Sequence, residues 1–284
     1  DIVAAQNEEY AVRFRELGIE SHRISVTGSL KFDGAQGDRN NPRTKNLCEL
    51  AEIRDDDVVF LAGSTQDPEE QLAIEAYQAL CKDHPKLRLI LVPRHPHRFD
   101  EVAELLGKSG LAWRRRMEFT ISPGSTSTNH GQPVTDNWQV LLVDTVGELG
   151  AWWGAATIGF VGGSLFSSRG GQNMIEPAAY GVPVCFGPNT QNFRDVVSML
   201  LDREAAVRVN DGAELAAFVR RCLDEPAEYA TAMGRRAADF VRQQQGAVER
   251  TWQQFAPLIP NGLESERFDG QIASKKKLAT KSAA

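Results

Sequence analysis

The sequence is poor in cysteine, and its four cysteines lie far apart, at positions 48, 81, 185 and 222. No two of them form a Cys-x-x-C pair and no histidine cluster lies beside them, which argues against a structural zinc site or a disulfide framework. We therefore expect buried thiols in a reducing compartment. The sequence also lacks an apolar run of the roughly 20 residues that a transmembrane helix needs. No signal peptide and no internal repeat are visible.

The bulk composition is that of a soluble globular protein. Of the 284 residues, 42% are hydrophobic and 25% are charged, and this length allows one large domain or two small ones. The net charge of −6 argues against a general nucleic-acid binder. The chain starts with Asp1 and not with Met, and runs at once into apolar residues that resemble an interior strand. We expect that an N-terminal portion precedes it, which leaves membrane anchoring of the parent protein open.

Short apolar segments alternate with amphipathic ones along almost the whole chain. Continuous apolar strands that alternate with helices predict an α/β fold with a parallel sheet covered on both faces. Ligands of such sheets bind beyond the carboxyl ends of the strands. The predicted strands are 1–6, 23–27, 57–62, 87–92, 111–116, 138–143, 156–161, 183–186 and 205–209. The predicted helices are 7–17, 42–50, 67–83, 98–109, 147–155, 173–180, 191–202 and 212–224, with two more helical segments between 226 and 260.

Composition also suggests where the domains divide. The polar segment 34–41 is predicted to link residues 1–33 to a main domain at 42–245. A long loop rich in Ser, Thr, Gly and Pro is predicted from Thr120 to Asp136. A last helix is expected at 246–260, followed by a disordered basic tail at 261–284. Helix 67–83 begins Asp-Pro-Glu-Glu, which predicts a capping aspartate and two acids near the positive helix end.

A glycine-rich stretch after strand 156–161 is the most informative feature of the chain. It reads Gly-Gly-Ser-Leu at 162–165, then Gly-Gly at 170–171, then Asn173-x-x-Glu176. Glycines there let bare amide N–H groups approach an anion such as a phosphate, and a carboxylate suits sugar hydroxyls. The structural alternative is a capping box, with Asn173 at the capping position and Glu176 three residues later. Both roles are compatible, and the flanking glycines favour a nucleotide-sugar site.

Two further motifs follow predicted strands. Arg94 stands after the strand that ends at Pro93, where a guanidinium can bind a phosphate or a carboxylate. Gly147 lies in Asp-Thr-Val-Gly-Glu-Leu at 144–149, where helix-start amides point at the same crevice. An exposed arginine at a strand end, and ordinary capping at the helix start, are the alternatives. Metal binding by His95 and His97 is disfavoured, because no cysteine lies nearby in the sequence and polar residues are common at a helix start.

Taken together, the motifs resemble those of the 3-deoxy-D-manno-octulosonic acid (Kdo) transferases, glycosyltransferases of lipid A biosynthesis. Seven strings match in the family's order over most of residues 1–200: Gly28-Ser-Leu-Lys-Phe-Asp33, Ala62-Gly-Ser-Thr65, Leu91-Val-Pro-Arg-His-Pro96, Asp144-Thr-Val-Gly-Glu-Leu149, Phe160-Val-Gly-Gly-Ser-Leu165, Gly170-Gly-Gln-Asn-Met-Ile-Glu-Pro-Ala-Ala179 and Gly187-Pro-Asn-Thr-Gln-Asn-Phe193. The resemblance implies a GT-B fold, with a Rossmann-like donor domain here and a remnant of the N-terminal acceptor domain. It also implies a last helix that returns to that N-terminal domain.

The resemblance also implies roles for individual residues. Lys31 matches a lysine that stabilises the transition state, and no metal or other cofactor is implied. The positions that match the family's CMP-binding residues are Pro93, Arg94, Val146, Gly147, Glu148, Asn173, Met174, Ile175 and Glu176. The implied donor is CMP-Kdo and the implied acceptor is a lipid A precursor, at the cytoplasmic face of the inner membrane. The family's general base is a glutamate of the N-terminal domain, so we expect the isolated chain to be inactive.

This sequence departs from the family at two positions. Gln172 stands where the family usually has His, and Val146 where it usually has Met. Gln172 cannot carry a positive charge, which puts a phosphate contact by its side chain in doubt, whereas Val146 would contribute only its backbone. Two other functions remain open at this stage. Another GT-B enzyme that uses a UDP-sugar, such as a transferase or an epimerase, would share the glycine loop and the ribose glutamate. A module that binds nucleotide without catalysis is the second.

Overall fold

The computed structural model describes residues 1–120, 138–166 and 170–259. The chain divides into two compact units, and each is described by itself. The larger unit runs from Gly34 to Gln243, and the smaller combines Asp1–Asp33 with the segment from Gln244 onwards. The loop predicted from Thr120 to Asp136 lies outside the described residues apart from its first position, and so does the tail predicted at 261–284.

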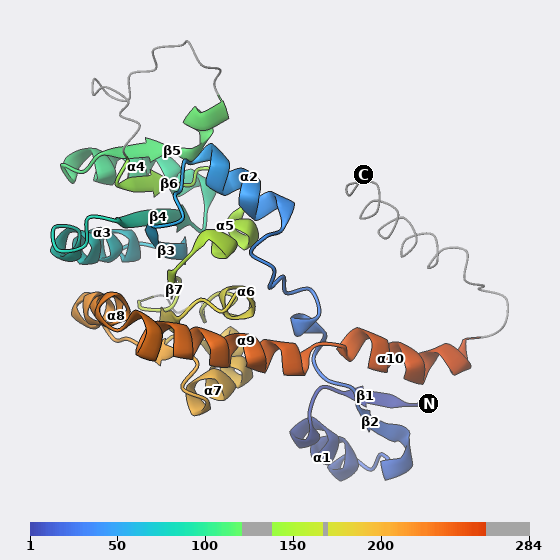
Figure 1. Cartoon of the computed structure of the whole chain (residues 1–284). Helices are drawn as coiled ribbons and strands as arrows, with labels where there is room; N and C mark the ends of the chain where they lie inside the picture. The colour runs from blue at the N-terminus through green and yellow to red at the C-terminus, as the bar shows by residue number, and fades with distance from the viewer. Residues whose placement is uncertain (121–137, 167–169, 260–284) are drawn as a thin grey trace. The chain divides into compact units, whose positions relative to one another are not determined.

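The larger unit is built on one sheet of seven parallel strands, in the order β5-β6-β4-β3-β7-β8-β9 (Figure 1). The chain first builds outward from β3 through β4, and then returns to place β7 on the other side of β3. In the register of these central strands, Phe60 lies between Leu89 and Ile158. The strands are Val58–Thr65 (β3), Leu87–Pro93 (β4), Trp113–Arg115 (β5), Val140–Leu142 (β6), Ile158–Val161 (β7), Val184–Phe186 (β8) and Val207–Arg208 (β9).

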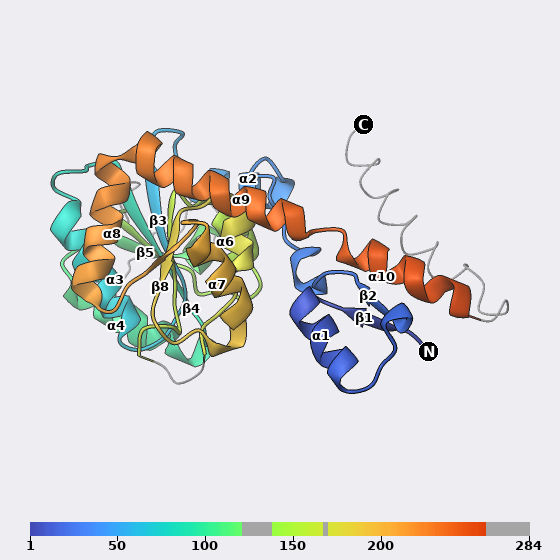
Figure 2. The same ribbon diagram turned by 90° about the horizontal axis from the view of Figure 1, so that it is seen from below.

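Helices cover both faces of this sheet. In Figures 1 and 2, α3, α4 and α8 lie on one face, and α2, α5 and α6 lie on the other. Side chains of α3, α4 and α8 form one buried cluster with alternate residues of the central strands, such as Phe60 and Leu89. The helices are Pro42–Leu50 (α2), Glu69–Leu80 (α3), Phe99–Lys108 (α4), Leu149–Ala155 (α5), Ile175–Ala179 (α6), Arg194–Asp202 (α7), Gly212–Asp224 (α8) and Ala232–Gln244 (α9). The predicted two-faced parallel sheet is therefore confirmed.

Local sequence explains why the elements lie where they do. All seven residues of β4 are buried, as expected for a continuous apolar strand in the middle of a parallel sheet. Helix α2 begins at a proline, and the side chain of Asn41 accepts a hydrogen bond from the amide of Thr44. Helix α8 is capped in the same way by Asp211, which accepts from Glu214. Both helices have the bounds that the sequence predicted.

The segment 34–41, which we expected to link two domains, is held against the larger unit. The guanidinium of Arg39 donates to the carbonyl oxygens of Gly154, Ala156 and Tyr180, at 3.0, 2.8 and 3.1 Å. Arg39 satisfies carbonyls at the end of α5 and just after α6, so it fastens this stretch beneath two helices of one face. The structure therefore places the segment within the larger unit.

In its described residues, 1–33 and 244–259, the smaller unit contains two short parallel strands and two α-helices besides short 3-10 turns. Strands β1 (Val3–Ala5) and β2 (Ile24–Val26) pair directly, and α1 (Glu8–Glu16) connects them. Helix α10 (Ala247–Phe255) packs on the same unit, because Arg250 donates to the carbonyl of Thr27 at 2.8 Å. The carboxylate of Asp33 accepts from the first amides of α10, at 2.6 Å from Gly246 and 3.2 Å from Ala247. The end of the Gly28–Asp33 string thus serves as the cap of α10.

The prediction that the cysteines are buried is correct for two of the four. Cys185 and Cys222 are buried, and burial raises the pKa of both thiols, to about 12 for Cys222. Cys48 and Cys81 are half-buried, and all four cysteines are free. Among the residues that the structure describes, no cluster of His, Cys, Asp and Glu is arranged to hold a metal ion. No helix in the same ranges is both long and apolar enough to cross a bilayer.

Candidate functional site

The carboxyl ends of the parallel strands meet at one edge of the sheet, and four motifs lie there. Thr65 ends β3, Pro93 ends β4, Leu142 ends β6 and Val161 ends β7, and these four strands are neighbours. The chain changes direction between β3 and β7, which is where ligands of such sheets bind. The loops that follow these strands therefore form the candidate site.

The amides of residues 163–165, after β7, are not available to a phosphate, which corrects our expectation for the first half of the glycine stretch. The side chain of Glu69 already accepts the amides of Gly163, Ser164 and Leu165, at 2.6, 2.9 and 2.9 Å. It also accepts the amide of Gln66 at 2.9 Å, and it is only 1% exposed. Burial raises the pKa of Glu69, and the four amide donors oppose that rise. An internal carboxylate thus fills the position that we had expected an external anion to take.

Glu69 and Glu70 are also in a different environment from the one predicted for them. We expected Asp67 to cap α3 and the two acids to face the helix dipole. Instead α3 has no side-chain cap, and both glutamates are 1% exposed. Glu70 binds Arg98 at 2.6 Å, in the turn that follows β4. The first turn of α3 therefore anchors the loops after β4 and after β7.

Arg94 is exposed at the end of β4 and lies against the second half of the glycine motif. Its Nε donates to the side-chain oxygen of Gln172 at 3.0 Å, and its amide donates to the carbonyl of Thr65 at 2.9 Å. The preceding Pro93 is buried and contributes no side-chain group to the edge. The structure therefore brings Arg94 beside Gln172 and Asn173, which are 78 and 79 residues away in the sequence.

The loop after β6 exposes backbone groups at the edge of the sheet. Val146 is 78% exposed, and Gly147 has φ +86°, a conformation that favours glycine. The side chain of Glu148 is engaged, because it accepts two hydrogen bonds from Arg116, at 2.9 and 2.8 Å. It also accepts the hydroxyl of Thr145 at 2.7 Å. Of the three predicted residues in this loop, Val146 and Gly147 lie open to a ligand, and the carboxylate of Glu148 fixes the turn.

Asn173 caps the first turn of α6, as the structural alternative predicted, but its bond to Glu176 is not that of a full capping box. The first residue before α6 is Met174, and the side-chain oxygen of Asn173 accepts from the amide of Ile175 at 3.0 Å. The side-chain nitrogen of Asn173 donates to Oε1 of Glu176 at 3.0 Å. A Cβ added at Gly150 would lie 3.8 Å from Oε2 of Glu176, so this carboxylate lies beside the exposed first turn of α5. Burial raises the pKa of Glu176, and the bond from Asn173 opposes the rise.

Unlike Asn173 and Glu176, the residues Met174 and Ile175 do not present their side chains to a ligand. Their side chains are buried in the core, at 0% and 2% exposure. A contact between either residue and a ligand must therefore involve the backbone. The site of the larger unit thus combines the guanidinium of Arg94, the carboxylate of Glu176 and the backbone around Gly147.

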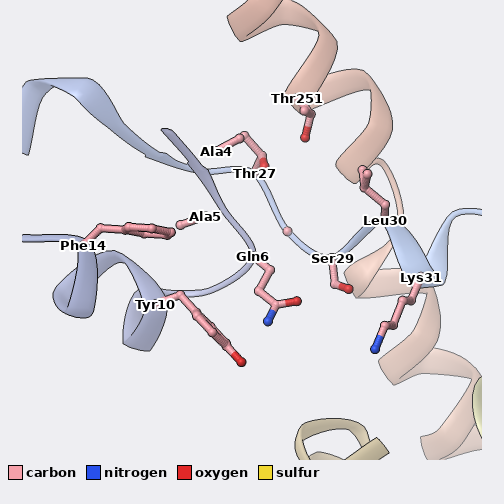
Figure 3. A pocket seen from close by; sticks show the side chains of 11 residues that line it. Ala4, Ala5, Gln6, Tyr10, Phe14, Thr27, Ser29, Leu30, Lys31 and Thr251 are labelled. Atoms are coloured by element: carbon pink, nitrogen blue, oxygen red, sulfur yellow. The ribbon is translucent and has the colours of Figure 1, made fainter. Parts of the chain in front are cut away.

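Lys31 belongs to the smaller unit, where it is exposed. It lines a pocket of about 440 Å³ together with apolar side chains such as Phe14 and Leu30. Figure 3 shows the polar ends of Gln6, Tyr10 and Lys31 on the same side of this pocket. Lys31 therefore lies in a pocket with mixed apolar and polar walls.

Sequence reasoning missed the role of Glu69, which accepts four loop amides at the edge of the site. Its one signal is the Glu-Glu pair at the start of α3, four residues after β3 ends. Acids at a helix start are usually solvent-exposed, and the pattern alone does not separate the two cases.

Comparison with solved structures defines the class of protein. The chain matches the crystal structure of the C-terminal CMP-Kdo binding domain of WaaA from Acinetobacter baumannii, with a TM-score of 0.60. The match is 32% identical in sequence and covers 71% of this chain and 98% of that one. The Anabaena protein HepE, in complex with UDP and glucose, matches with a TM-score of 0.50 at 15% identity, over 90% of this chain and 62% of that one. The fold is that of the GT-B glycosyltransferases.

A third solved structure shows how widely this fold is used. A putative UDP-N-acetylglucosamine 2-epimerase from Listeria monocytogenes matches with a TM-score of 0.52 at 15% identity, over 94% of this chain and 61% of that one. At that identity the match concerns the fold alone. No family model matches the sequence.

Sequence relatives narrow the class to one family. The 3-deoxy-D-manno-octulosonic acid transferase of Haemophilus influenzae is 31% identical over 92% of this chain, and that of Bordetella pertussis is 38% identical over 88%. This chain belongs to the family of 3-deoxy-D-manno-octulosonic acid transferases, as its motifs predicted. It spans 58% and 55% of the lengths of these two relatives, a little over half.

Proposed function

We propose that this chain supplies the donor-binding part of an enzyme that transfers Kdo from CMP-Kdo to a lipid A precursor, with inversion at the anomeric carbon and without a metal ion. The observation that carries the proposal is that the segments after β4 and β7 join at one sheet edge: Arg94 binds Gln172, and the next residue, Asn173, binds Glu176 of α6. The identity of 32% to a domain described as binding CMP-Kdo supports the choice of nucleotide.

Each group in the site has a distinct task in this reaction. Arg94 is exposed and positively charged, so it binds the phosphate of CMP, where negative charge grows as the bond to the sugar breaks. Glu176 accepts hydrogen bonds from the ribose hydroxyls. The amide groups around Gly147 bind the nucleotide through the backbone, since that glycine admits a ligand close to the main chain. Asn173 holds Oε1 of Glu176 and leaves Oε2 directed towards α5.

The proposal assigns stabilisation of the transition state to Lys31, which lies in the smaller unit. An ammonium group that stabilises the charge of a departing phosphate contributes about 3 kcal/mol. The proposal includes no metal ion or other cofactor. The acceptor is a lipid A precursor at the cytoplasmic face of the inner membrane, and nucleic acid is not a partner.

Nucleotide binding to the purified chain tests the proposal. Isothermal titration calorimetry with CMP, UMP and UDP, each without added metal, compares the possible donors directly. Binding of CMP in clear preference to UMP and UDP supports the proposed donor. Preference for UDP would indicate a UDP-sugar enzyme of the same fold, and no binding of any of the three would contradict the site itself.

Two variants locate the binding to the proposed residues. Glu176→Ala removes the carboxylate that binds ribose and is expected to weaken CMP binding more than it lowers Tm. Glu214→Ala is the matched control, because Asn210 donates to Glu214 at 2.9 Å as Asn173 does to Glu176, but on α8. Equal losses of CMP affinity in both variants would remove the argument for a ribose site. If the wild-type protein binds CMP but the complete enzyme transfers no Kdo, the result would support a non-catalytic module.

A further inference from the structure

Glu69 is one of the most completely bonded side chains in the described part of the larger unit. Oε2 accepts the amides of Gln66 and Gly163, and Oε1 accepts those of Ser164 and Leu165. A carboxylate offers about four acceptor sites, so all of them are used. Hydrogen bonds to an ionised group are about twice as strong as neutral ones. The side chain therefore sets the path of the glycine loop from inside the protein.

Hydrogen bonds and the peptide bond between Gly171 and Gln172 connect Glu69 to the donor site. The carbonyl of Gly163 accepts the amide of Gly171 at 3.1 Å. The next residue, Gln172, accepts Nε of Arg94 at 3.0 Å. One buried carboxylate is thus connected to the exposed guanidinium through Gly163, Gly171 and Gln172.

The same geometry explains why glycines occupy positions 162, 163 and 171. A Cβ at Gly162 would lie 2.7 Å from Oε2 of Glu69 and 2.6 Å from Cα of Thr65, so no other residue fits. Gly163 and Gly171 have φ values of +64° and +78°, which favour glycine. The glycines therefore admit an internal carboxylate, in the way that phosphate-binding loops admit an external one.

We infer that Glu69 is a positioning residue of the donor site: its buried carboxylate holds the glycine loop so that Gln172 directs the guanidinium of Arg94. This inference rests on the proposed function only for the identity of the ligand that Arg94 binds. It assigns the phosphate-binding task to Arg94 and not to the amides at 163–165, since Glu69 already accepts those amides.

Nuclear magnetic resonance tests the connection without any ligand. Glu69→Gln keeps the size of the side chain but replaces one acceptor oxygen with an NH₂ donor. Two of the four amides that bind Glu69 therefore lose their acceptor. The amide signals of Gly163 to Leu165 and the Nε–Hε signal of Arg94 are expected to shift together. The matched control is Asp57→Asn, at the other end of β3, where a carboxylate with 8% exposure binds Arg88 at 2.9 Å. The control is expected to lower Tm and to leave the Arg94 signal unchanged.

Calorimetry with CMP tests the consequence for binding. Glu69→Gln is expected to weaken CMP binding about tenfold, and Asp57→Asn to leave it unchanged. In a Gln172→Ala background, Glu69→Gln is expected to have a clearly smaller effect, because the connection to Arg94 is already broken. If Glu69→Gln does not fold, Glu69→Ala with added sodium formate replaces it, with sodium chloride as the ionic-strength control. Formate that enters the vacated position is expected to restore CMP affinity.

The outcomes separate this inference from the proposed function. An unchanged Arg94 signal in Glu69→Gln, with a loss of Tm like that of Asp57→Asn, would reduce Glu69 to a stabilising residue and overturn the inference. Full additivity of Glu69→Gln and Gln172→Ala would also overturn it. If the wild-type chain binds no CMP while the Arg94 signal still responds to Glu69→Gln, the positioning role stands and the nucleotide assignment fails.

Discussion

Replacing Glu176 by glutamine is expected to separate ligand binding from stability, because the two effects have opposite signs. Burial raises the pKa of Glu176, so the folded unit binds the proton more tightly than the unfolded chain does. The resulting stability is fully present below the unfolded-state pKa and is lost as the pH rises through the folded-state pKa. Near neutral pH the ionised carboxylate therefore costs stability. Glu176→Gln removes this cost, keeps an acceptor for Asn173, and is expected to have a Tm at least equal to that of the wild type.

The affinity for CMP is expected to fall in the same variant. A hydrogen bond to a charged acceptor contributes about 1.5–3 kcal/mol and one to a neutral acceptor about 0.5–1.5 kcal/mol. The difference is about 1 kcal/mol for each ribose hydroxyl, which is about fivefold in affinity for one hydroxyl and about thirtyfold for two. Glu176→Ala loses both oxygens, so its affinity is expected to fall further and its Tm to drop as the Asn173 bond is lost.

Two measurements check this prediction. Calorimetry with CMP at one pH above neutrality gives the affinity, and thermal unfolding at a series of pH values from acid to neutral gives the stability. Glu214→Gln is the control for a glutamate that pairs with asparagine elsewhere, and its CMP affinity is expected to equal that of the wild type. A lower Tm with unchanged CMP affinity in Glu176→Gln would refute the ribose role and favour a purely structural one.

Three further predictions follow from the geometry. Arg94→Gln is expected to weaken binding of CMP by about tenfold or more and to leave binding of cytidine unchanged, since only the phosphate loses its partner; calorimetry with both ligands checks this. Asp33→Ala removes the cap from α10 and is expected to destabilise that helix by about 1–2 kcal/mol, seen as faster amide exchange in the segment 246–255 alone. Chelation with EDTA is expected to leave CMP affinity unchanged, and a loss of binding would contradict a metal-independent site.

Much of the larger unit could be predicted because each element contains its own local signals. Helix α2 has Asn41 and a proline at its start, and α8 has Asp211, so both could be placed at their observed bounds. The strands are continuous apolar segments, and their alternation with helices predicted parallel pairing. Most strands are shorter in the structure than the sequence predicted. Hydrogen bonds between strands, and not the apolar sequence, decide where a strand ends.

For the candidate site, the sequence predicted some residues correctly and missed others. Arg94 and Glu176 were identified from their place after strands, and the structure joins their loops through Gln172 and Asn173. The glycine stretch was identified correctly as a site of close backbone approach, but its amides at 163–165 bind an internal carboxylate and not the expected phosphate. The partner, Glu69, lies 94 residues before Gly163, and no pattern within either segment refers to the other.

The sequence by itself determined the order and type of the elements, the family to which the chain belongs, and the residues that lie at the carboxyl edge of the sheet. Those properties follow from neighbouring residues: apolar runs, caps, glycines and short motifs. Only the tertiary structure decided that the carboxylate of Glu69 fills the glycine loop and that Arg39 fastens the segment 34–41 to the larger unit. A charged side chain is buried where the fold supplies enough partners, and those partners come from distant parts of the chain.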